Sequence, residues 1–549
     1  MKKPALSRKT AKTTAAPARL GAPGRSRNGL SVLAAAGVLA LVFGVAEARP
    51  PAPPAARPAQ TAAAAQVERT AAVCPAPIQG LTGSTTITAL TPGTGGSAAG
   101  GSATVTDVNP PASPAPSGSP APSGSASPSA AASSSAAPGQ SGGSARLTLA
   151  KPGVPVSVQA ASGDSAPGTS AVATGAFAPG FTVTQTTAAT DQTNTGLSGV
   201  TCTPDGTSFW FTGASTSGNR HDYVSLTNVE SSSAVVDLKI YGDQGEVDSD
   251  TASGITVAPG SSQRILLSTV TNGQVDDLAV QVLVRSGRVG AALHAADGSA
   301  GADWLPASVD PAPSLVIPGL PADLSDARLI VFAPGQDDAD LKIELSGPTG
   351  WFVPAGHESI HVKAGMVNAV DLGTITRVGQ SSNGVVSALR LSPTDPANAT
   401  PVVAGLRIDR GSGGKSDSTW LAGSQPVGKR ATVADVRGGG ASTLLLTATG
   451  GAANVRVTAS ASTGGGTPTT QTVQIPAGNT VSLPAPEPSG GNGPYGVTVE
   501  TLSGGPVMAA RMLTVTTNNI PMFTIQALTD DHSYVQVPQA DQDPGGLVH

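Results

Sequence analysis

Few residues in this sequence could do chemistry, and their spacing does not assemble a catalytic or metal site. His357 and His361 lie four positions apart, but they flank the start of a predicted strand, where this spacing does not give the shared helical face that a zinc pair requires. The acidic run at Asp337, Asp338 and Asp340 lacks the Asp-x-Asp-x-Asp-Gly spacing of a calcium loop. We expect solvated side chains at turns, with no metal and no cofactor. A glycoside hydrolase site made of two carboxylates stays an alternative, because the two groups need only lie about 5 to 9 Å apart on different loops.

Two short motif matches occur in settings that do not suit them. Gly139-Gln-Ser-Gly-Gly143 has the pattern of a nucleophile elbow, which needs a strand before it and a helix after it, but it lies in a Pro/Ala/Ser/Gly tract. Gly414-Lys415-Ser416 resembles the end of a P-loop, yet Asp409 occupies the place of the first glycine. We expect both matches to be coincidental and the protein not to be an enzyme.

The tryptophans are the other candidates for ligand contact. Trp210, Trp304 and Trp420 recur with the repeat described below, which favours packing over stacking on a sugar. Trp351 breaks this period and stands with Phe352 after the turn residues Gly347-Pro-Thr-Gly350. Because binding residues are often carried on loops, Trp351 and Phe352 are the candidate contact surface.

Composition limits the classes of fold. The chain has 549 residues, 68 Gly, 47 Pro and 12% charged residues, against a usual charged fraction of about 25%. This length predicts several domains and excludes a single core. Gly, Pro, Ser, Thr and Val are residues of turns, linkers and strands, so a helical enzyme is disfavoured.

The N-terminus predicts export. Residues 1–28 contain eight basic and no acidic residues, so this arm carries +8 and the rest of the chain −13 of the net −5. Residues 29–48 are almost wholly apolar and approach the length of about 20 that crosses a bilayer. Since basic residues beside the first apolar segment stay in the cytoplasm, we expect a single-pass membrane protein with its bulk outside, and no nucleic-acid partner. Ala46-Glu47-Ala48 also fits signal cleavage, which would make the protein secreted.

Export favours a disulfide between Cys74 and Cys202, the two cysteines of the chain. The loop that it would close contains residues 109–144, a tract of Pro, Ala, Ser and Gly that cannot bury enough apolar surface to order itself. Residues 49–73 begin with a Pro/Ala-rich stretch that predicts a spacer between the membrane and the folded part.

Beyond residue 215 the sequence repeats. Alternating apolar residues precede Gly260, Gly365 and Gly478, and further apolar residues follow each glycine, which predicts strand, turn and strand. A valine followed by two small residues recurs downstream, as Val289, Val402 and Val507. Bulky residues follow these valines, namely Trp304, Trp420 and Met522.

Copies of about 105 residues with at least six strands suit a two-sheet sandwich of immunoglobulin-like type, whereas propeller blades need only about 40 to 50 residues. The expected fold is all-β, with tandem sandwiches after one transmembrane helix and disordered linkers. The predicted segments are a basic arm, an anchor or signal, a spacer, a disulfide-closed β region, three sandwich repeats and a tail: 1–28, 29–48, 49–73, 74–215, 216–310, 311–424, 425–540 and 541–549.

The chain resembles a known family in the order of these features. A basic arm and apolar anchor are followed by Cys74-Pro75, by Cys202 shortly before Phe209-Trp210-Phe211, and by Leu226-Thr-Asn228 with the Ala-Gly turns. This order is similar to that of the exported actinobacterial proteins grouped as domain of unknown function 5719, over about residues 74–530. The resemblance implies a membrane-associated cell-envelope protein and supplies no catalytic residues.

Three functions agree with these features. The leading hypothesis is a non-enzymatic structural or adaptor protein that binds exported envelope proteins or wall polysaccharide through loops and strand edges. The alternatives are an envelope glycan-binding module and a hydrolase with its site between domains. The low aromatic and histidine content favours the first.

Overall fold

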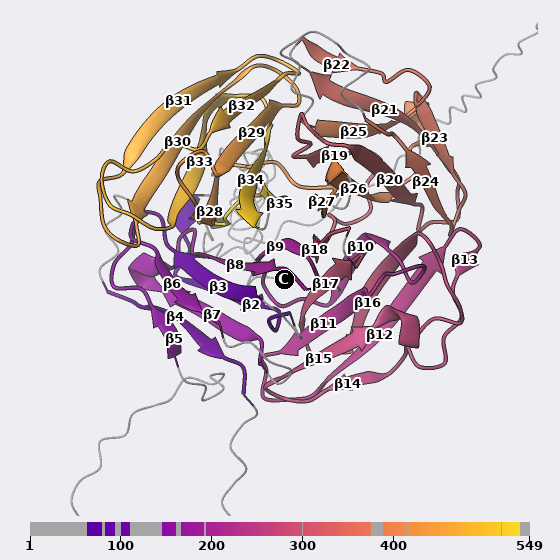
Figure 1. Ribbon diagram of the computed structural model, residues 1–549, viewed down its shortest axis with the longest axis horizontal. Helices are drawn as coiled ribbons and strands as arrows, with labels where there is room; N and C mark the ends of the chain where they lie inside the picture. The colour runs from indigo at the N-terminus through magenta and orange to yellow at the C-terminus, as the bar shows by residue number, and fades with distance from the viewer. Residues whose placement is uncertain are drawn as a thin grey trace, which may run out of the picture. The chain divides into compact units, whose positions relative to one another are not determined.

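Short β-strands separated by turns make up almost all of the regular structure (Figure 1). The computed structural model describes residues 63–78, 83–93, 100–109, 145–160, 166–191, 194–298, 300–347, 349–374, 388–412, 415–517 and 519–537. Over these ranges there is no α-helix, and helical turns are limited to short 3₁₀ segments such as Gly175–Phe177, Leu267–Thr269 and Pro396–Asn398. The all-β prediction is therefore confirmed.

Several predicted segments fall outside these ranges. The arm 1–28, the apolar segment 29–48, most of the tract 109–144 and the tail 541–549 are not among the described residues. Within the described part, no helix has the length and apolar character needed to span a bilayer.

The described strands form nine antiparallel sheets, and eight of these combine in pairs into four sandwiches within the unit Ala64–Gln536. We number the strand positions 1 to 8 in chain order within a sandwich. One sheet then has the order 1-6-3-4 and the other the order 5-2-7-8, in every copy. Position 4 is split into two short strands in the second and third sandwiches.

The first two sandwiches comprise residues 69–201 and 208–305. The strands of the first are β2 (Arg69–Cys74), β3 (Gly83–Leu90), β4 (Ala103–Asp107), β5 (Ala145–Thr148), β6 (Val156–Gln159), β7 (Thr169–Thr174), β8 (Thr182–Ala189) and β9 (Gly196–Thr201). Those of the second are β10 (Ser208–Ala214), β11 (Tyr223–Asn228), β12 (Ala234–Gly242), β13 (Gly245–Glu246), β14 (Ile255–Val257), β15 (Ser261–Leu266), β16 (Leu278–Ser286), β17 (Gly290–Ala296) and β18 (Ala302–Leu305).

The other two sandwiches comprise residues 315–422 and 430–528. The strands of the third are β19 (Leu315–Pro318), β20 (Asp326–Phe332), β21 (Ala339–Gly347), β22 (Gly350–Phe352), β23 (Ser359–Val362), β24 (Val367–Asp371), β25 (Ala388–Pro393), β26 (Val403–Ser412) and β27 (Lys415–Ala422). Those of the fourth are β28 (Arg430–Val436), β29 (Ser442–Ala448), β30 (Ala453–Ser462), β31 (Thr469–Ile475), β32 (Thr480–Pro484), β33 (Tyr495–Gly504), β34 (Val507–Thr517) and β35 (Ile520–Leu528).

These sheets correct three sequence-based expectations. The strand order differs from the immunoglobulin order, in which the first two strands share a sheet, because positions 1 and 2 here lie in opposite sheets. Strand β10 pairs with β16, so residues 208–214 belong to the second sandwich and not to the region 74–215. The spacer 49–73 ends earlier than expected, because its Pro-free end forms strands from Ala63 onward.

The recurring glycines occupy the turn between positions 4 and 5. Gly260, Gly365 and Gly478 have φ values of 57°, 70° and 72°, a region that L side chains rarely adopt. The two flanking strands lie in different sheets, so this turn carries the chain across the sandwich. The first copy has its own version at Gly153, with φ of 82°, after Leu147-Thr-Leu149-Ala-Lys-Pro152.

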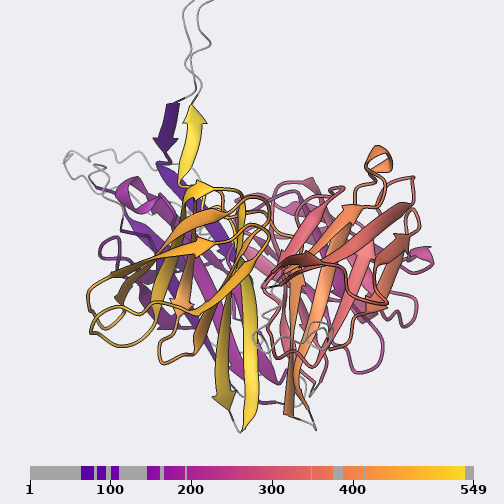
Figure 2. The ribbon, with the colours of Figure 1, turned by 90° about the horizontal axis from the view of Figure 1, so that it is seen from above.

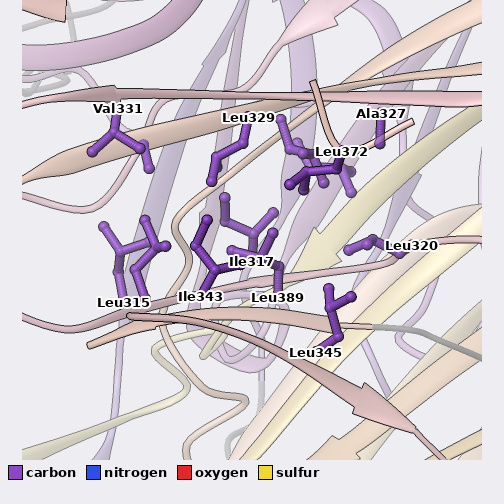
Figure 3. Packing of buried hydrophobic residues seen from close by; sticks show 14 of the residues in the cluster. Leu315, Ile317, Leu320, Ala327, Leu329, Val331, Ile343, Leu345, Leu372 and Leu389 are labelled. Atoms are coloured by element: carbon purple, nitrogen blue, oxygen red, sulfur yellow. The ribbon is translucent and has the colours of Figure 1, made fainter. Parts of the chain in front are cut away.

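The cores follow the alternation read from the sequence. Val236, Leu238 and Ile240 on β12 are buried, and so are Leu341, Ile343 and Leu345 on β21. Period-2 alternation places such residues on one sheet face. Figure 3 shows Ile343 and Leu345 facing Leu329 and Leu372 across the third sandwich.

Each sandwich also packs against its neighbours through small apolar clusters. Their members are Ile78, Ala292 and Trp304 between the first and second sandwiches; Trp210, Ile330 and Phe332 between the second and third; and Leu197, Leu513 and Met522 between the first and fourth. The core of the third sandwich continues into the fourth at Leu445 and Phe523. Burial of apolar surface therefore joins each sandwich to the next, and the fourth to the first.

Two strands lie outside the four sandwiches. Strand β1 (Ala63–Gln66) pairs with β36 (Tyr534–Val537) in a two-stranded sheet. Figure 2 shows these strands side by side, coloured for opposite ends of the chain. The first and last described strands are thus hydrogen-bonded partners.

Candidate functional site

The last strand of every sandwich runs into a shared buried junction. Strands β9, β18, β27 and β35, all at position 8, contact one another, so residues from the four copies meet there (Figure 1). The buried polar residues of this junction include Asp303, Asp417, Thr419, Arg511 and Gln526.

Asp303 on β18 joins three sandwiches. Its Oδ1 accepts hydrogen bonds from the backbone N–H groups of Gly199 on β9 and of Trp304, both at 2.7 Å. Its Oδ2 accepts one from the Thr419 hydroxyl on β27 at 2.6 Å. Burial raises the pKa of Asp303 to about 7, against an ordinary value of 3.8.

Asp417 on β27 also connects three sandwiches, but only through backbone donors. Its Oδ2 accepts from the N–H groups of Leu197 on β9 at 3.2 Å and of Phe523 on β35 at 2.8 Å. Its Oδ1 accepts from the N–H of Ser418 at 2.9 Å. Burial raises the pKa of Asp417 well above its usual value despite these donors, and the nearby Asp303 carboxyl contributes in the same direction.

A second buried group lies on the fourth sandwich. Arg511 on β34 is fully buried and donates from Nη2 to Oε1 of Gln526 on β35. Burial lowers the pKa of Arg511 to about 10. Burial also acts to raise the pKa of Asp435, but its paired ion Arg437, at 3.0 Å, lowers it overall.

This geometry suits cohesion more than catalysis. Each junction carboxylate is enclosed and accepts hydrogen bonds from strands of neighbouring sandwiches, Asp303 through both oxygens and Asp417 through Oδ2, so a substrate could reach it only by displacing those strands. A buried polar group that lost such a partner would carry an uncompensated desolvation cost. The junction therefore ties the four sandwiches into one packed assembly.

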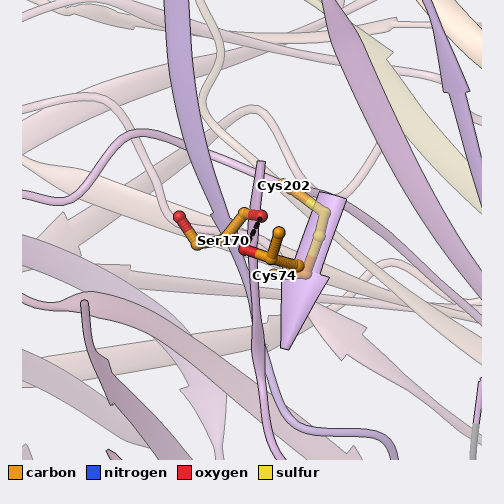
Figure 4. The surroundings of a disulfide bond; sticks show 4 residues. Cys74, Ser170 and Cys202 are labelled. Carbon is orange, nitrogen blue, oxygen red and sulfur yellow. Dashed lines mark hydrogen bonds between the residues drawn. A yellow bond between two sulfur atoms is a disulfide. The ribbon is translucent and has the colours of Figure 1, made fainter. Parts of the chain in front are cut away.

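The expected disulfide is present in the first sandwich. Cys74 ends β2 and Cys202 follows β9, and their Cα atoms are 4.5 Å apart across a sequence separation of 128 (Figure 4). The N–H of Val73 donates to the carbonyl of Thr203 at 2.7 Å, so backbone pairing supports the cross-link. The bond joins the two chain ends of this sandwich.

Trp351 and Phe352, the candidate contact surface, are placed differently from the expectation. They lie on the short strand β22, and both side chains are only partly exposed. The Arg390 guanidinium lies over the Trp351 ring at 4.3 Å, and Phe352 packs against the core of the third sandwich. A Cβ built on Gly478 of the fourth sandwich would come within 3.1 Å of the Trp351 ring. The pair therefore packs within the third sandwich and beside the fourth. It does not lie on a free loop.

The three periodic tryptophans are buried at junctions between copies. Trp210 is adjacent to Tyr241 and Phe332, and Trp304 to Tyr223 and His294. Trp420 belongs to the third sandwich but completes the core of the second. The structure therefore supports the interpretation that these tryptophans recur because they pack between copies.

His361 is exposed on β23 and lies 2.8 Å from Asp340, while Asp338 accepts from the N–H of Ala364 at 2.8 Å. No group of three or more metal-ligating side chains occurs in the described ranges.

Sequence reasoning missed the junction carboxylates, although a signal exists. Asp303 directly precedes Trp304, and Asp417 precedes Trp420 by three positions, so each acid shares a strand with a recurring bulky residue. An acid beside a repeated buried tryptophan is a signal of an enclosed carboxylate.

One sequence comparison assigns the chain to a family. The model of a family described as "Family of unknown function (DUF5719)" matches residues 156–486, from β6 of the first sandwich into the fourth. Because this match covers more than half of the chain, the protein belongs to that family of unknown function. No curated protein matches the sequence.

Proposed function

We propose that the protein is a non-enzymatic structural or adaptor protein of the cell envelope, held at the membrane through residues 29–48 with its folded part outside the cell. The observation that carries this proposal is the shared junction. Its carboxylates accept hydrogen bonds from strands of neighbouring sandwiches, as expected for a stiff platform that offers outer surfaces to exported proteins or wall polymers.

Crosslinking in intact cells tests the adaptor role. Photoreactive groups placed on outer loops of the full-length protein should capture a small, reproducible set of exported proteins or wall polymer. A capture pattern that matches an unrelated membrane protein of equal abundance would contradict the proposal.

Topology and activity are tested separately. A reporter fused to the C-terminus should be active only outside the cytoplasm. Incubation of the purified protein with wall glycans should give no cleavage products. Cleavage that disappears on replacing a single carboxylate would support the hydrolase alternative instead.

A further inference from the structure

A polar groove of about 710 Å³ lies between the first and fourth sandwiches. One wall is the sheet face formed by β3, β6 and β8, and the other is Arg437 with the segment from Glu487 to Tyr495. This volume is within the range of about 300 to 1,000 Å³ typical of ligand sites. The groove is separate from the buried junction.

The sheet wall presents hydroxyl and amide groups. The Gln159 amide donates to the Thr86 hydroxyl at 3.0 Å, and the Thr88 and Ser157 hydroxyls are 2.8 Å apart on the same pair of strands. Ser84 and Gln159 are exposed. Hydroxyl and amide groups can each donate and accept, so this wall offers both halves of a hydrogen bond along its length.

The opposite wall offers polar groups without net charge. Arg437 is paired with buried Asp435 through two contacts of 3.0 Å, and the Glu487 carboxylate accepts from the N–H of Gly439 at 2.7 Å. Gly490, with φ of 73°, has no neighbouring atom within 4 Å of the position that a Cβ would take. The one cation and the one anion of the lining are thus already engaged within the protein.

The groove between the second and third sandwiches has a different chemistry. There Arg328 extends to Asp277, with contacts of 3.0 and 2.6 Å, and also bonds Asp371. Its lining contains four acidic residues: Asp243, Glu246, Asp276 and Asp277. An uncharged, hydroxyl-rich wall is therefore a property of the first sandwich and not of every junction in the repeat.

We propose that the groove between the first and fourth sandwiches binds a neutral, hydroxyl-rich chain, an oligosaccharide or a segment of polysaccharide. Sugar hydroxyls donate and accept like those of Thr86 and Ser157, and they require no compensating charge. The exposed residues of the glycine-containing segment leave the groove open along one side, which suits a chain more than a small enclosed molecule.

Titration calorimetry of the full-length protein with neutral tetrasaccharides of glucose, mannose, galactose or N-acetylglucosamine tests this assignment. At least one of them should bind. The double variant Thr86→Val/Gln159→Leu should weaken that binding by about tenfold to a hundredfold, because two hydrogen-bonding groups are lost. Asn492→Ala on the opposite wall should weaken it by about threefold to tenfold.

The matched control is Thr470→Val/Gln471→Leu. These residues are exposed on β31, outside the groove, and Thr470 pairs with Thr458 at 3.2 Å much as Gln159 pairs with Thr86. The control should bind as tightly as the wild type. Failure of every tetrasaccharide to bind, equal loss in both double variants, or preference for dextran sulfate or a polar peptide would overturn the proposal. None of these outcomes depends on where the protein resides, so they are independent of the adaptor role.

Discussion

Asp303 and Asp417 are alike in burial but differ in the chemistry of their partners. Asp303 faces a hydroxyl through one oxygen, whereas Asp417 faces only backbone N–H groups. A hydroxyl can accept as well as donate, so a proton on Oδ2 of Asp303 would keep its hydrogen bond. A proton on either oxygen of Asp417 would face another donor. The two residues should therefore respond in opposite ways to the same substitution.

The stability of the protein should fall as the pH rises from about 4 to about 7. The pKa of Asp303 is 3.8 as an ordinary side chain and about 7 in the folded protein, so the folded state holds the proton more tightly. This contribution is complete below the unfolded pKa and is lost as the pH rises through the folded pKa, and it amounts to on the order of 4 kcal/mol. Asp303→Asn should remove this part of the pH dependence, since the amide oxygen keeps both N–H donors and the amide nitrogen donates to Thr419. Urea unfolding from pH 4 to pH 8 measures both proteins, and parallel curves would refute this assignment.

Asp417→Asn should instead destabilise the protein. In either orientation of the amide that this substitution introduces, its NH₂ group would face a backbone N–H donor, and two donors cannot hydrogen-bond to each other. The expected loss is about 2 to 4 kcal/mol, the cost of leaving buried donors unsatisfied. The same urea titrations report it. A variant as stable as Asp303→Asn would show that the donors at Asp417 do not matter.

At the scale of elements, the small residues after each repeated valine explain how copies approach one another. Ala292, Gly405 and Ala510 follow these valines by the same three positions, and each lies against the preceding sandwich. A Cβ on Gly405 would lie 1.8 Å from the carbonyl oxygen of Thr212 on β10. Small side chains at strand position 7 thus set the spacing between sandwiches.

Gly405→Ala should destabilise the protein by about 1 to 3 kcal/mol, because the added methyl group overlaps a backbone atom of the neighbouring copy. Gly451→Ala is the matched control: no atom lies within 4 Å of its Cβ position, and it should be close to neutral. Thermal unfolding compares the two. Equal effects would mean that lost backbone freedom, and not the contact with Thr212, decides the result.

Local pattern made much of this fold predictable. Turn glycines and alternating residues such as Ile343 and Leu345 report backbone conformation and sheet face, which depend on neighbours in sequence. The sequence predicted a disulfide-closed β region at 74–215 but did not assign it to the repeat, because its turn before Gly153 has one extra residue and the tract 109–144 interrupts it. The immunoglobulin-like order and the role of Asp417 could not be predicted, because both depend on which distant strands become neighbours.

At the scale of the whole molecule, the contacts that close the assembly are the most distant in sequence. Strand β9 contacts β35, and β1 pairs with β36. The disulfide acts earlier in the chain, where it fixes the ends of the first sandwich against each other. This sandwich is therefore held in shape independently of the copy that later packs against it.

Unreduced, denatured protein should contain no titratable thiol, since both cysteines are in the Cys74–Cys202 bond. The double variant Cys74→Ser/Cys202→Ser should lose about 4 to 5 kcal/mol of unfolding free energy, the chain-entropy cost of opening a loop of this length. Thiol counting and urea unfolding measure the two effects. Two free thiols in the wild type would contradict the cross-link.

The pairing of β1 with β36 sets an order of events during biogenesis. A polypeptide that emerges from the ribosome or a translocation channel N-terminus first displays β1 and β9 long before their partners have been made. Leu197 on β9 is covered by Leu513 and Met522 in the finished protein, so its side chain stays exposed to solvent until those residues have been made. The nascent first sandwich is thus the part of the protein most in need of a chaperone. A premature stop codon near the end of the reading frame would leave the apolar surface of β9 permanently exposed.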